Sequence, residues 1–201
     1  MVANEWLDNL PCEVVEVDER GTPRLVHVDP ATGSERLGAP VTDPAAPPGL
    51  GAWLEEWWPL PEPGLRAELG STRDAAWADV VARVRRGVAV AVDYGHTRDG
   101  RPPFGSLRSY RDGAEVDVVP DGSRDVTAHV AVDAVAAAVG GRLLRQREVL
   151  HRLGVRGERP ALGLARSAPA SYLSALARAT EAAELTDPAG LGGFFWVITE
   201  I

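Results

Sequence analysis

The clearest apolar run in the chain covers residues 88–92, where five small apolar residues follow one another without polar alternation. Such a run predicts a strand buried on both faces, as in a parallel sheet covered by helices. Gly87 ends a helical pattern just before it, and a polar Asp-Tyr-Gly-His segment follows directly. Because ligands bind beyond the carboxyl ends of strands in open α/β sheets, we expect chemistry at Asp93, Tyr94 and His96. The alternative is that Asp93 only caps the next turn.

Other patterns precede this strand. Residues 1–3 are apolar and lead at once into a polar cluster, so we expect a strand cut short by the start of the chain. Residues 13–29 alternate between apolar and polar positions around a turn-forming segment, which predicts a β-hairpin. Residues 38–64 are rich in proline and glycine but contain three tryptophans at helical spacing. We expect these tryptophans to form core or lid packing, with stacking on a ligand as the alternative.

A helix is predicted next, with Ser71 as its N-cap, an apolar stripe that includes Trp77, and Gly87 as its terminating residue. Residues 97–124 show little regular pattern, and a loop of this length is usually functional or mobile. Residues 125–130 alternate briefly between polar and apolar positions. The remaining predicted elements are an alanine-rich helix capped by Asp133, a strand at 143–144, a helix at 148–153, a linker at 156–168, a helix at 171–185 and a strand at 194–198.

Composition narrows the function classes. The net charge of −8 argues against a nucleic-acid-binding surface, which is normally basic. All 21 basic residues are arginine, and the cluster formed by Arg83, Arg85 and Arg86 suits the carboxyl end of a helix. The single cysteine, Cys12, excludes an internal disulfide and a cysteine-based zinc site, and the histidines lack metal-ligand spacing. No signal peptide or membrane span is predicted, so we expect a cytoplasmic protein.

Several local motifs, in order along the chain, resemble one family. They are Asn-Glu-x-x-Asp-x-Leu-Pro at residues 4–11, Asp-Tyr-Gly-His at 93–96, Gly-Ser-Leu-Arg-x-Tyr at 105–110 and Asp-Val-Thr-Ala-His-Val at 125–130. The chain is similar, over nearly all its length, to the C-terminal part of the MidA-like methyltransferases that use S-adenosylmethionine (SAM). That family includes the mitochondrial arginine methyltransferase needed for complex I assembly. Where the family has an Asp-Phe pair, Ala131 and Val132 stand here.

The resemblance implies an α/β fold with a Rossmann-like methyltransferase sheet. We expect residues 1–201 to form a single partial domain that lacks the N-terminal strands, with residues 13–64 as an insertion carrying the hairpin. In the family, a glycine-rich turn upstream of the first motif holds SAM, and no glycine turn in this sequence replaces it. SAM is therefore the implied cofactor, its binding residues are not identified here, and binding by this chain alone is in question. Missing strands would leave an exposed sheet edge, which predicts self-association or a complementing chain.

The resemblance also implies site residues for methylation of a protein arginine. A guanidinium is a poor nucleophile until it loses a proton, and nearby carboxylates can orient it and relay that proton. We expect Glu5 and Asp93 to face the methyl acceptor and Asp8 to hold the loop. The residues expected to bind or recognise substrate are Asn4, Tyr94, His96, Arg108, Asp125, Thr127 and His129. The bland alternative is a hydrogen-bonded network that only shapes the loops.

Two functions therefore stay open at the level of sequence. One is a SAM-dependent methyltransferase represented by its substrate-facing half. The other is a non-catalytic binding or partner subunit that lacks the SAM glycine loop. A hydrolase that uses His96 or His129 is disfavoured, because no serine or cysteine nucleophile lies on a recognisable elbow.

Overall fold

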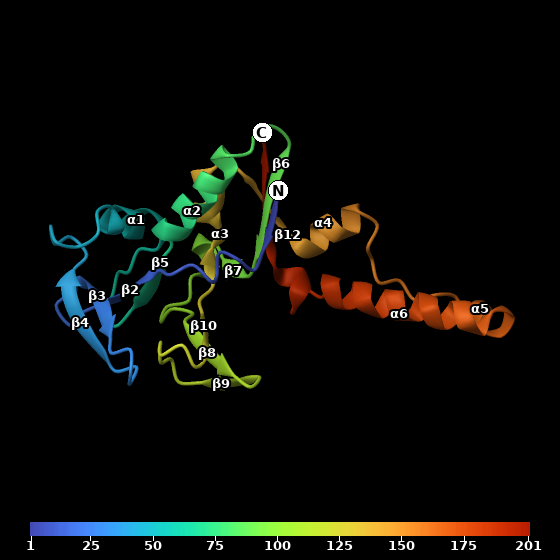
Figure 1. Cartoon of the computed structure of the whole chain (residues 1–201), viewed down its shortest axis with the longest axis horizontal. Helices are drawn as coiled ribbons and strands as arrows, with labels where there is room; N and C mark the ends of the chain where they lie inside the picture. Colours follow the sequence, from blue (N-terminus) through green and yellow to red (C-terminus); the bar gives the residue numbers. More distant parts are fainter.

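The computed structural model describes residues 1–201, and its central sheet contains four strands in the order β1-β6-β13-β12. These strands are β1 (Val2–Asn4), β6 (Val88–Asp93), β12 (Arg142–Arg145) and β13 (Phe195–Glu200). β1 runs parallel to β6, with Val2 opposite Val90, whereas β13 runs antiparallel to both β6 and β12. The short strand expected at the start of the chain is therefore present, and its outer edge carries no partner strand. The sheet is mixed rather than purely parallel (Figure 1).

One face of the central sheet is buried more deeply than the other. Ala89 and Ala91 of β6 pack with Trp77 of α2 (Ser71–Ala82) and with α3 (Val132–Ala138) in one apolar cluster. On the opposite face Val88 is exposed and Val90 is half-buried, so burial on both faces is wrong for the first half of the strand. On this face the helix α4 (Gln146–Arg152) packs mainly against β12 and β13.

A second sheet precedes α2 and has the order β4-β3-β2-β5, antiparallel throughout. Its strands are β2 (Glu13–Val17), β3 (Pro23–Val28), β4 (Glu35–Pro40) and β5 (Arg66–Leu69). The predicted hairpin of residues 13–29 is confirmed, and β5 lies just beyond the predicted insertion of residues 13–64. Helix α1 (Leu50–Trp57) covers this sheet. Trp53 and Trp58 are buried in its core, which confirms packing as their role.

Regular structure also occurs within the segment expected to be a loop. After β7 (Gly95–His96) and η1 (Arg98–Gly100), the strands β8 (Arg108–Arg111), β9 (Ala114–Val116) and β10 (Asp125–Thr127) form a small antiparallel sheet. The expectation of little regular structure over residues 97–124 is therefore wrong for η1, β8 and β9, while the rest of that segment is irregular. The strands β8 and β9 are largely exposed on both faces, so no apolar alternation marks them. Asp112 and Gly113 form the turn between them, with φ values of 52° and 78°.

The C-terminal part leaves the body of the molecule and returns to it. β11 (Val130–Ala131) pairs with β7 and leads into α3, β12 and α4; α5 (Leu162–Ser167), α6 (Pro169–Thr186) and η2 (Leu191–Gly193) follow. Figure 1 shows α5 and the adjoining end of α6 projecting away from the sheets. The predicted linker of residues 156–168 thus contains a short helix. The sequence pattern does not predict this helix, because it has no apolar stripe of its own and is stabilised by its contacts with α6.

The helix ends differ from the expected ones. Gly70, not Ser71, is the N-cap of α2, and the helix ends at Ala82, ahead of Gly87. A Cβ at Gly70 would lie 2.9 Å from a ring carbon of Trp53, so only glycine fits between α2 and α1. Asp133 lies inside the first turn of α3 rather than at its cap. No helix of the chain combines the length and apolar character that crossing a bilayer requires.

Candidate functional site

The loop after β1 is anchored by a buried carboxyl group at the end of β6. Asp93 Oδ2 accepts hydrogen bonds from the backbone nitrogens of Leu7 (3.0 Å) and Asp8 (3.3 Å), and its Oδ1 accepts one from Tyr94 (3.1 Å). Because β1 and β6 are parallel neighbours, their carboxyl ends meet and bring these groups together. Asp93 therefore holds this loop, the task that the sequence suggested for Asp8.

The charge state of Asp93 is sensitive to this environment. Burial, and after it the negative charge of Asp8, raises the pKa of Asp93 to about 7, against the lowering effect of its backbone hydrogen bonds. The carboxyl group can therefore hold or release a proton near neutral pH. A perturbed carboxyl at the end of a central strand is typical of a functional site.

Asp8 forms the centre of a second group. Its Oδ2 contacts the hydroxyl group of Tyr94 and accepts a hydrogen bond from Thr127 Oγ1 at 3.2 Å, and its Oδ1 accepts one from Asn9 at 2.8 Å. The Tyr94 and Thr127 hydroxyl groups also contact each other. Burial and the hydrogen bond to Asp8 raise the pKa of Tyr94, so this phenol stays protonated. Three separated sequence motifs thus converge here.

Two side chains that the sequence analysis did not single out tie the motifs together. Arg73 is buried and donates to the backbone oxygens of Asp8 (3.0 Å), Leu10 (3.2 Å) and His129 (3.1 Å). Glu68 is also buried and accepts hydrogen bonds from the backbone and the hydroxyl group of Ser106. Ser106 Oγ in turn accepts one from the His129 backbone nitrogen at 2.9 Å.

A cleft of about 490 Å³ opens beside this network. Its walls are formed by His96 of β7, by the loop before β8, by Arg108 and Tyr110 of β8, and by His129. Its lining residues are Gly95, His96, Gly100, Pro102, Gly105, Ser106, Arg108, Tyr110 and His129. The His129 ring packs edge-on against Tyr94, with ring centres 5.4 Å apart, which connects the cleft to the Asp8 network.

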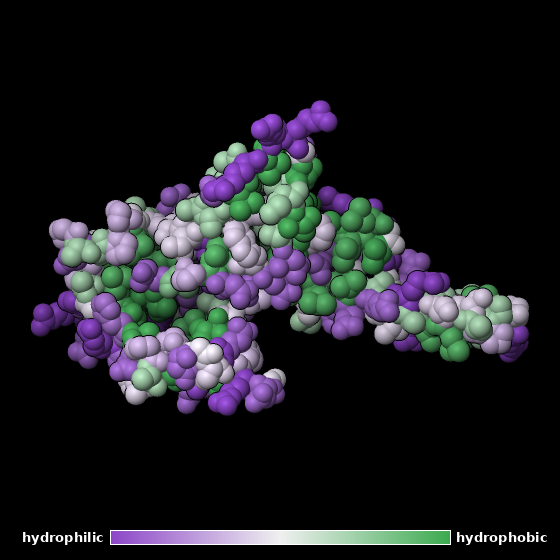
Figure 2. All heavy atoms as spheres, viewed as in Figure 1, coloured by the Kyte–Doolittle hydropathy of each residue, from purple (hydrophilic) through white to green (hydrophobic).

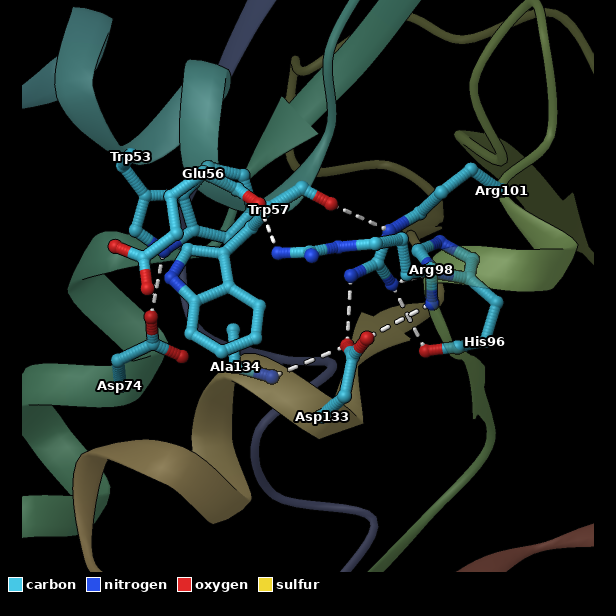
Figure 3. A network of polar contacts seen from close by, with 9 residues as sticks. All are labelled: Trp53, Glu56, Trp57, Asp74, His96, Arg98, Arg101, Asp133 and Ala134. Atoms are coloured by element: carbon cyan, nitrogen blue, oxygen red, sulfur yellow. Dashed lines mark hydrogen bonds and ion pairs between the residues drawn. The ribbon is translucent and has the colours of Figure 1, made fainter.

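His96, which lines the cleft, also belongs to a network of polar contacts around Arg101 (Figure 3). The buried Arg101 guanidinium pairs with Asp133 at 2.6 Å and donates to His96 Nδ1 at 2.7 Å and to the Trp57 carbonyl oxygen at 3.1 Å. Burial, and after it the positive charge of Arg101, lowers the pKa of His96 to about 3. His96 is therefore neutral at physiological pH.

The remaining predicted site residues lie apart from these contacts. Asn4 and Glu5 are exposed at the carboxyl end of β1, where Asn4 Nδ2 donates to Glu5 Oε1 at 3.1 Å and Glu5 has a φ of 46°. Asp125 is exposed on β10 and is not among the lining residues of the cleft. The structure brings together Asp8, Asp93, Tyr94 and Thr127 around the loop, and His96, Arg108 and His129 around the cleft.

The residues missed by the sequence analysis share one property. Arg101, Arg73 and Glu68 act through side chains that reach a different element, and no local pattern distinguishes them from other charged positions. Ser106 is different, because it belongs to the Gly-Ser-Leu-Arg motif and a motif-based search could have included it. No group of three or more histidine, cysteine, aspartate or glutamate side chains is arranged to hold a metal ion.

Comparisons with known proteins agree with the motifs. A family model described as "Putative S-adenosyl-L-methionine-dependent methyltransferase" matches residues 1–147. Two solved structures from Burkholderia thailandensis cover the whole chain at 25% sequence identity. One is an uncharacterized protein of the COG1565 superfamily with a TM-score of 0.71. The other, with a TM-score of 0.69, is described as a superfamily member and "likely methyl transferase" bound to S-adenosyl-homocysteine.

The matches cover all of this chain but only part of each solved structure. The chain covers 54% of the first structure and 52% of the second, so it spans about half the length of each. No curated protein matches it significantly.

Proposed function

The chain belongs to the family of SAM-dependent methyltransferases whose model matches residues 1–147. We propose that it supplies the methyl-acceptor side of the reaction. The proposal rests on one observation: motif residues from β6, from β10 and from the loop after β1 converge at the carboxyl ends of two parallel strands. Ligands of open α/β sheets bind at such ends. We propose SAM as the cofactor, in keeping with the bound S-adenosyl-homocysteine of the similar structure.

We further propose that the acceptor is a protein arginine. Methyl transfer from a sulfonium is an in-line displacement, so correct placement of the nucleophile supplies much of the rate. A guanidinium needs a carboxylate that is free to contact it. Glu5 meets this need, because its side chain is exposed and its only hydrogen-bond partner is Asn4, whereas Asp8 and Asp93 are committed to the loop.

The assigned roles differ between the three carboxyl groups. Glu5 orients the acceptor and stabilises its positive charge. Asp93 fixes the position of the loop that carries Glu5 and can take up a proton near neutral pH, since its pKa is about 7. Asp8 anchors Tyr94 and Thr127, and through Tyr94 it sets the position of His129 at the cleft.

The fit of this chain to the whole of SAM is incomplete. Exposed polar side chains at the end of β1, those of Asn4 and Glu5, suit the hydroxyl or ammonium groups of such a cofactor. An open glycine turn between a strand and a helix is lacking, because Gly70, which joins β5 to α2, is closed off by Trp53. These residues alone therefore do not form a complete site for SAM.

Calorimetric titration of the 201-residue chain with S-adenosyl-homocysteine tests the proposal. Micromolar binding supports a cofactor site on this chain, and Glu5→Gln should then slow methylation of an arginine peptide by about 100-fold or more. The matched control is Glu19→Gln, which alters an exposed turn residue far from the site. An unchanged methylation rate in Glu5→Gln would remove Glu5 from the mechanism.

A second function is favoured by the unpaired edge of β1. In this alternative the chain is a partner subunit that binds a complementing polypeptide and does not bind SAM itself. Absence of S-adenosyl-homocysteine binding, together with a folded chain by circular dichroism, supports this alternative over the first. Binding by the isolated chain contradicts it.

A further inference from the structure

Arg101 occupies an unusual position for an arginine. Its side chain is only 7% exposed, and it contacts three separate elements. Its Nη2 binds Asp133 of α3 at 2.6 Å, its Nε donates to Trp57 at the end of α1 at 3.1 Å, and its Nη1 contacts Nδ1 of His96 in β7 at 2.7 Å. Nη1 also donates to the backbone oxygen of His96 at 3.0 Å. The guanidinium is thus fixed on every side (Figure 3).

This contact determines the tautomer of His96. A guanidinium carries only donors and does not lose its proton in proteins, so the atom facing it must be an acceptor. His96 Nδ1 therefore carries no hydrogen, and the single hydrogen of the neutral ring lies on Nε2. A protonated ring would place two N–H groups against each other at 2.7 Å, so this geometry also excludes the imidazolium form.

The Nε2–H group has no partner. Nε2 is a buried nitrogen without a hydrogen-bond acceptor, on a residue that is 6% exposed and lines the cleft. An unpaired buried donor is destabilising, so its retention calls for an explanation. The charged or titratable groups that act on His96 are Arg101, Asp133 and His129, and the Trp58 ring packs edge-on at 4.6 Å between ring centres.

The cleft beside His96 is built for an acceptor. Its lining residues include no aspartate or glutamate, although the chain contains 29 of them and carries a net charge of −8. They do include Arg108 and Tyr110, whose side chains carry donors: Arg108 Nε pairs with Glu115 at 3.2 Å and Nη1 donates to the Leu107 oxygen at 2.8 Å, which leaves Nη2 and the Tyr110 hydroxyl group for a ligand. The hydroxyl group of Ser106 is already used by Glu68 and by the His129 backbone. The free groups therefore favour a ligand with a carboxylate or carbonyl oxygen.

We propose that Arg101 is a positioning residue that holds His96 as the Nε2–H imidazole, and that His96 donates this hydrogen bond to a carboxylate or amide oxygen of the substrate. The inference rests on the proposed function only in taking the ligand of this cleft to be the methyl-acceptor substrate. Arg101 touches no ligand itself. Within an arginine-containing protein, the oxygen recognised would be a backbone carbonyl or a neighbouring acidic side chain, while the guanidinium lies toward Glu5.

Nitrogen NMR of the imidazole side chains tests the positioning role without cofactor or activity. In the wild-type chain, His96 should show a hydrogen on Nε2 and none on Nδ1 throughout pH 5–8. In Arg101→Gln it should become a mixture of tautomers, because the fixed donor that faces Nδ1 is gone, and its pKa should rise only in part, because burial of the ring remains. Arg101→Lys keeps the charge but loses the fork of donors, so the titration should stay suppressed while the tautomer becomes mixed.

Two wild-type results would overturn the tautomer assignment: a hydrogen on Nδ1, or a His96 titration within pH 5–8. The signals of exposed His27 provide an internal reference in each spectrum. If Arg101→Gln unfolds, Arg101→Lys still supplies the comparison.

The ligand is tested by titrating the same protein with acetate and, separately, with N-methylacetamide. A downfield shift of the His96 Nε2–H proton with acetate alone identifies a carboxylate, and a shift with the amide alone identifies a backbone carbonyl. His96→Leu should weaken probe binding by about tenfold, the loss expected for one hydrogen bond, and His96→Gln should recover most of it because glutamine retains an N–H donor.

No shift with either probe overturns the substrate contact, and an upfield-shifted proton assigns the N–H to the face of Trp58 instead. Failure of the proposed methyltransferase function is a separate outcome. It would appear as absent S-adenosyl-homocysteine binding in a chain whose His96 still responds to the probes.

Discussion

At the scale of single residues, short polar side chains position the loops of this site. Asp93 accepts hydrogen bonds from the backbone N–H groups of Leu7, Asp8 and Tyr94, and each of these would be left without a partner if the carboxyl group were removed. An unpaired buried donor is more costly than a lost hydrogen bond at the surface. The carboxyl group of Asp93 is thus needed for the loop whatever its part in catalysis.

Asp93→Ala should therefore lower the free energy of unfolding by about 2–5 kcal/mol at pH 6, as measured by urea denaturation. Asp125→Ala is the matched control, since Asp125 is an exposed motif residue, and it should change stability by less than about 0.5 kcal/mol. Equal effects of the two changes would contradict the anchoring role of Asp93.

The lowered pKa of His96 determines the direction in which stability should change with pH. Its folded pKa, about 3, lies below its ordinary value of 6.5, so between these values the unfolded chain binds a proton that the folded chain does not. Stability contributed by neutral His96 is complete above pH 6.5 and is lost as the pH falls toward 3. The stability difference between wild type and His96→Gln should shrink on acidification, by up to about 1.4 kcal/mol per pH unit. A constant difference in urea denaturation from pH 7.5 to 4.5 would contradict this.

The motif residues of the site could be predicted from the sequence, but the residues that hold them in position could not. Asp8, Tyr94, Thr127 and His96 were selected because they stand in polar motifs after strands, and strand ends converge by topology. Arg101 could not be selected in this way. It is one of 21 arginines, it lies in a loop, and its importance comes from burial between α1, β7 and α3, which only the folded chain provides.

At the scale of elements, the contact between α1 and α2 contains a carboxyl group with only one of its two oxygens hydrogen-bonded. Asp74 of α2 accepts a hydrogen bond from Trp53 Nε1 of α1 at 2.6 Å, while its second oxygen is buried without a partner. Burial raises the pKa of Asp74 to about 6. The ionised form is therefore disfavoured in the fold, and its cost grows as the pH rises from about 4 through 6.

Asp74→Asn should keep the acceptor for Trp53 and remove this cost. We expect a gain of about 1–3 kcal/mol in the free energy of unfolding at pH 7.5 and a clearly smaller gain at pH 4.5, nearer the ordinary pKa of 3.8. Thermal or urea unfolding at both pH values measures it, with exposed Asp79→Asn of the same helix as control. A gain that is equal at both pH values would rule out ionisation as the cause.

The predictability of elements followed their apolar patterns. The strands β2, β3, β6, β12 and β13 were recognised from apolar runs or alternation. The strands β8 and β9 were not, because they are largely exposed and are paired through a turn at Gly113. β5 lacks alternation for another reason: its last three residues are all buried, including the charged Glu68, whose partners lie beyond residue 100.

At the scale of the whole molecule, the unpaired edge of β1 offers hydrogen-bonding groups to another chain. Glu5 donates to Val92 and Val90 donates to Met1, so the odd-numbered residues of β1 face β6 and the N–H groups of Val2 and Asn4 point outward. A free edge of this kind is a site for strand addition. The exposed leucines of the projecting helices, Leu162 and Leu173, are a second candidate for association. Figure 2 shows hydrophobic atoms on the surface of this projecting part.

We expect the isolated chain to self-associate, as measured by size-exclusion chromatography with light scattering. Val2→Pro should reduce association by removing an outward N–H group while leaving the bonds to β6 intact. Leu162→Ser is the comparison for the projecting helices and should have no effect if the edge of β1 is responsible. A monodisperse wild-type monomer would contradict the expectation.

The helix α3 belongs to both halves of the protein at once. Ala134, together with Ala131 at the end of β11, lies in the apolar cluster of the β4-β3-β2-β5 sheet, while Val132 and Val135 lie in the cluster of the central sheet. Neighbouring residues on one short segment thus close two cores, and neither core can open without exposing the other. In native-state hydrogen exchange, amides in β3 and in β6 should therefore report the same opening free energy, as members of one cooperative unit rather than of a host and a separately unfolding insertion.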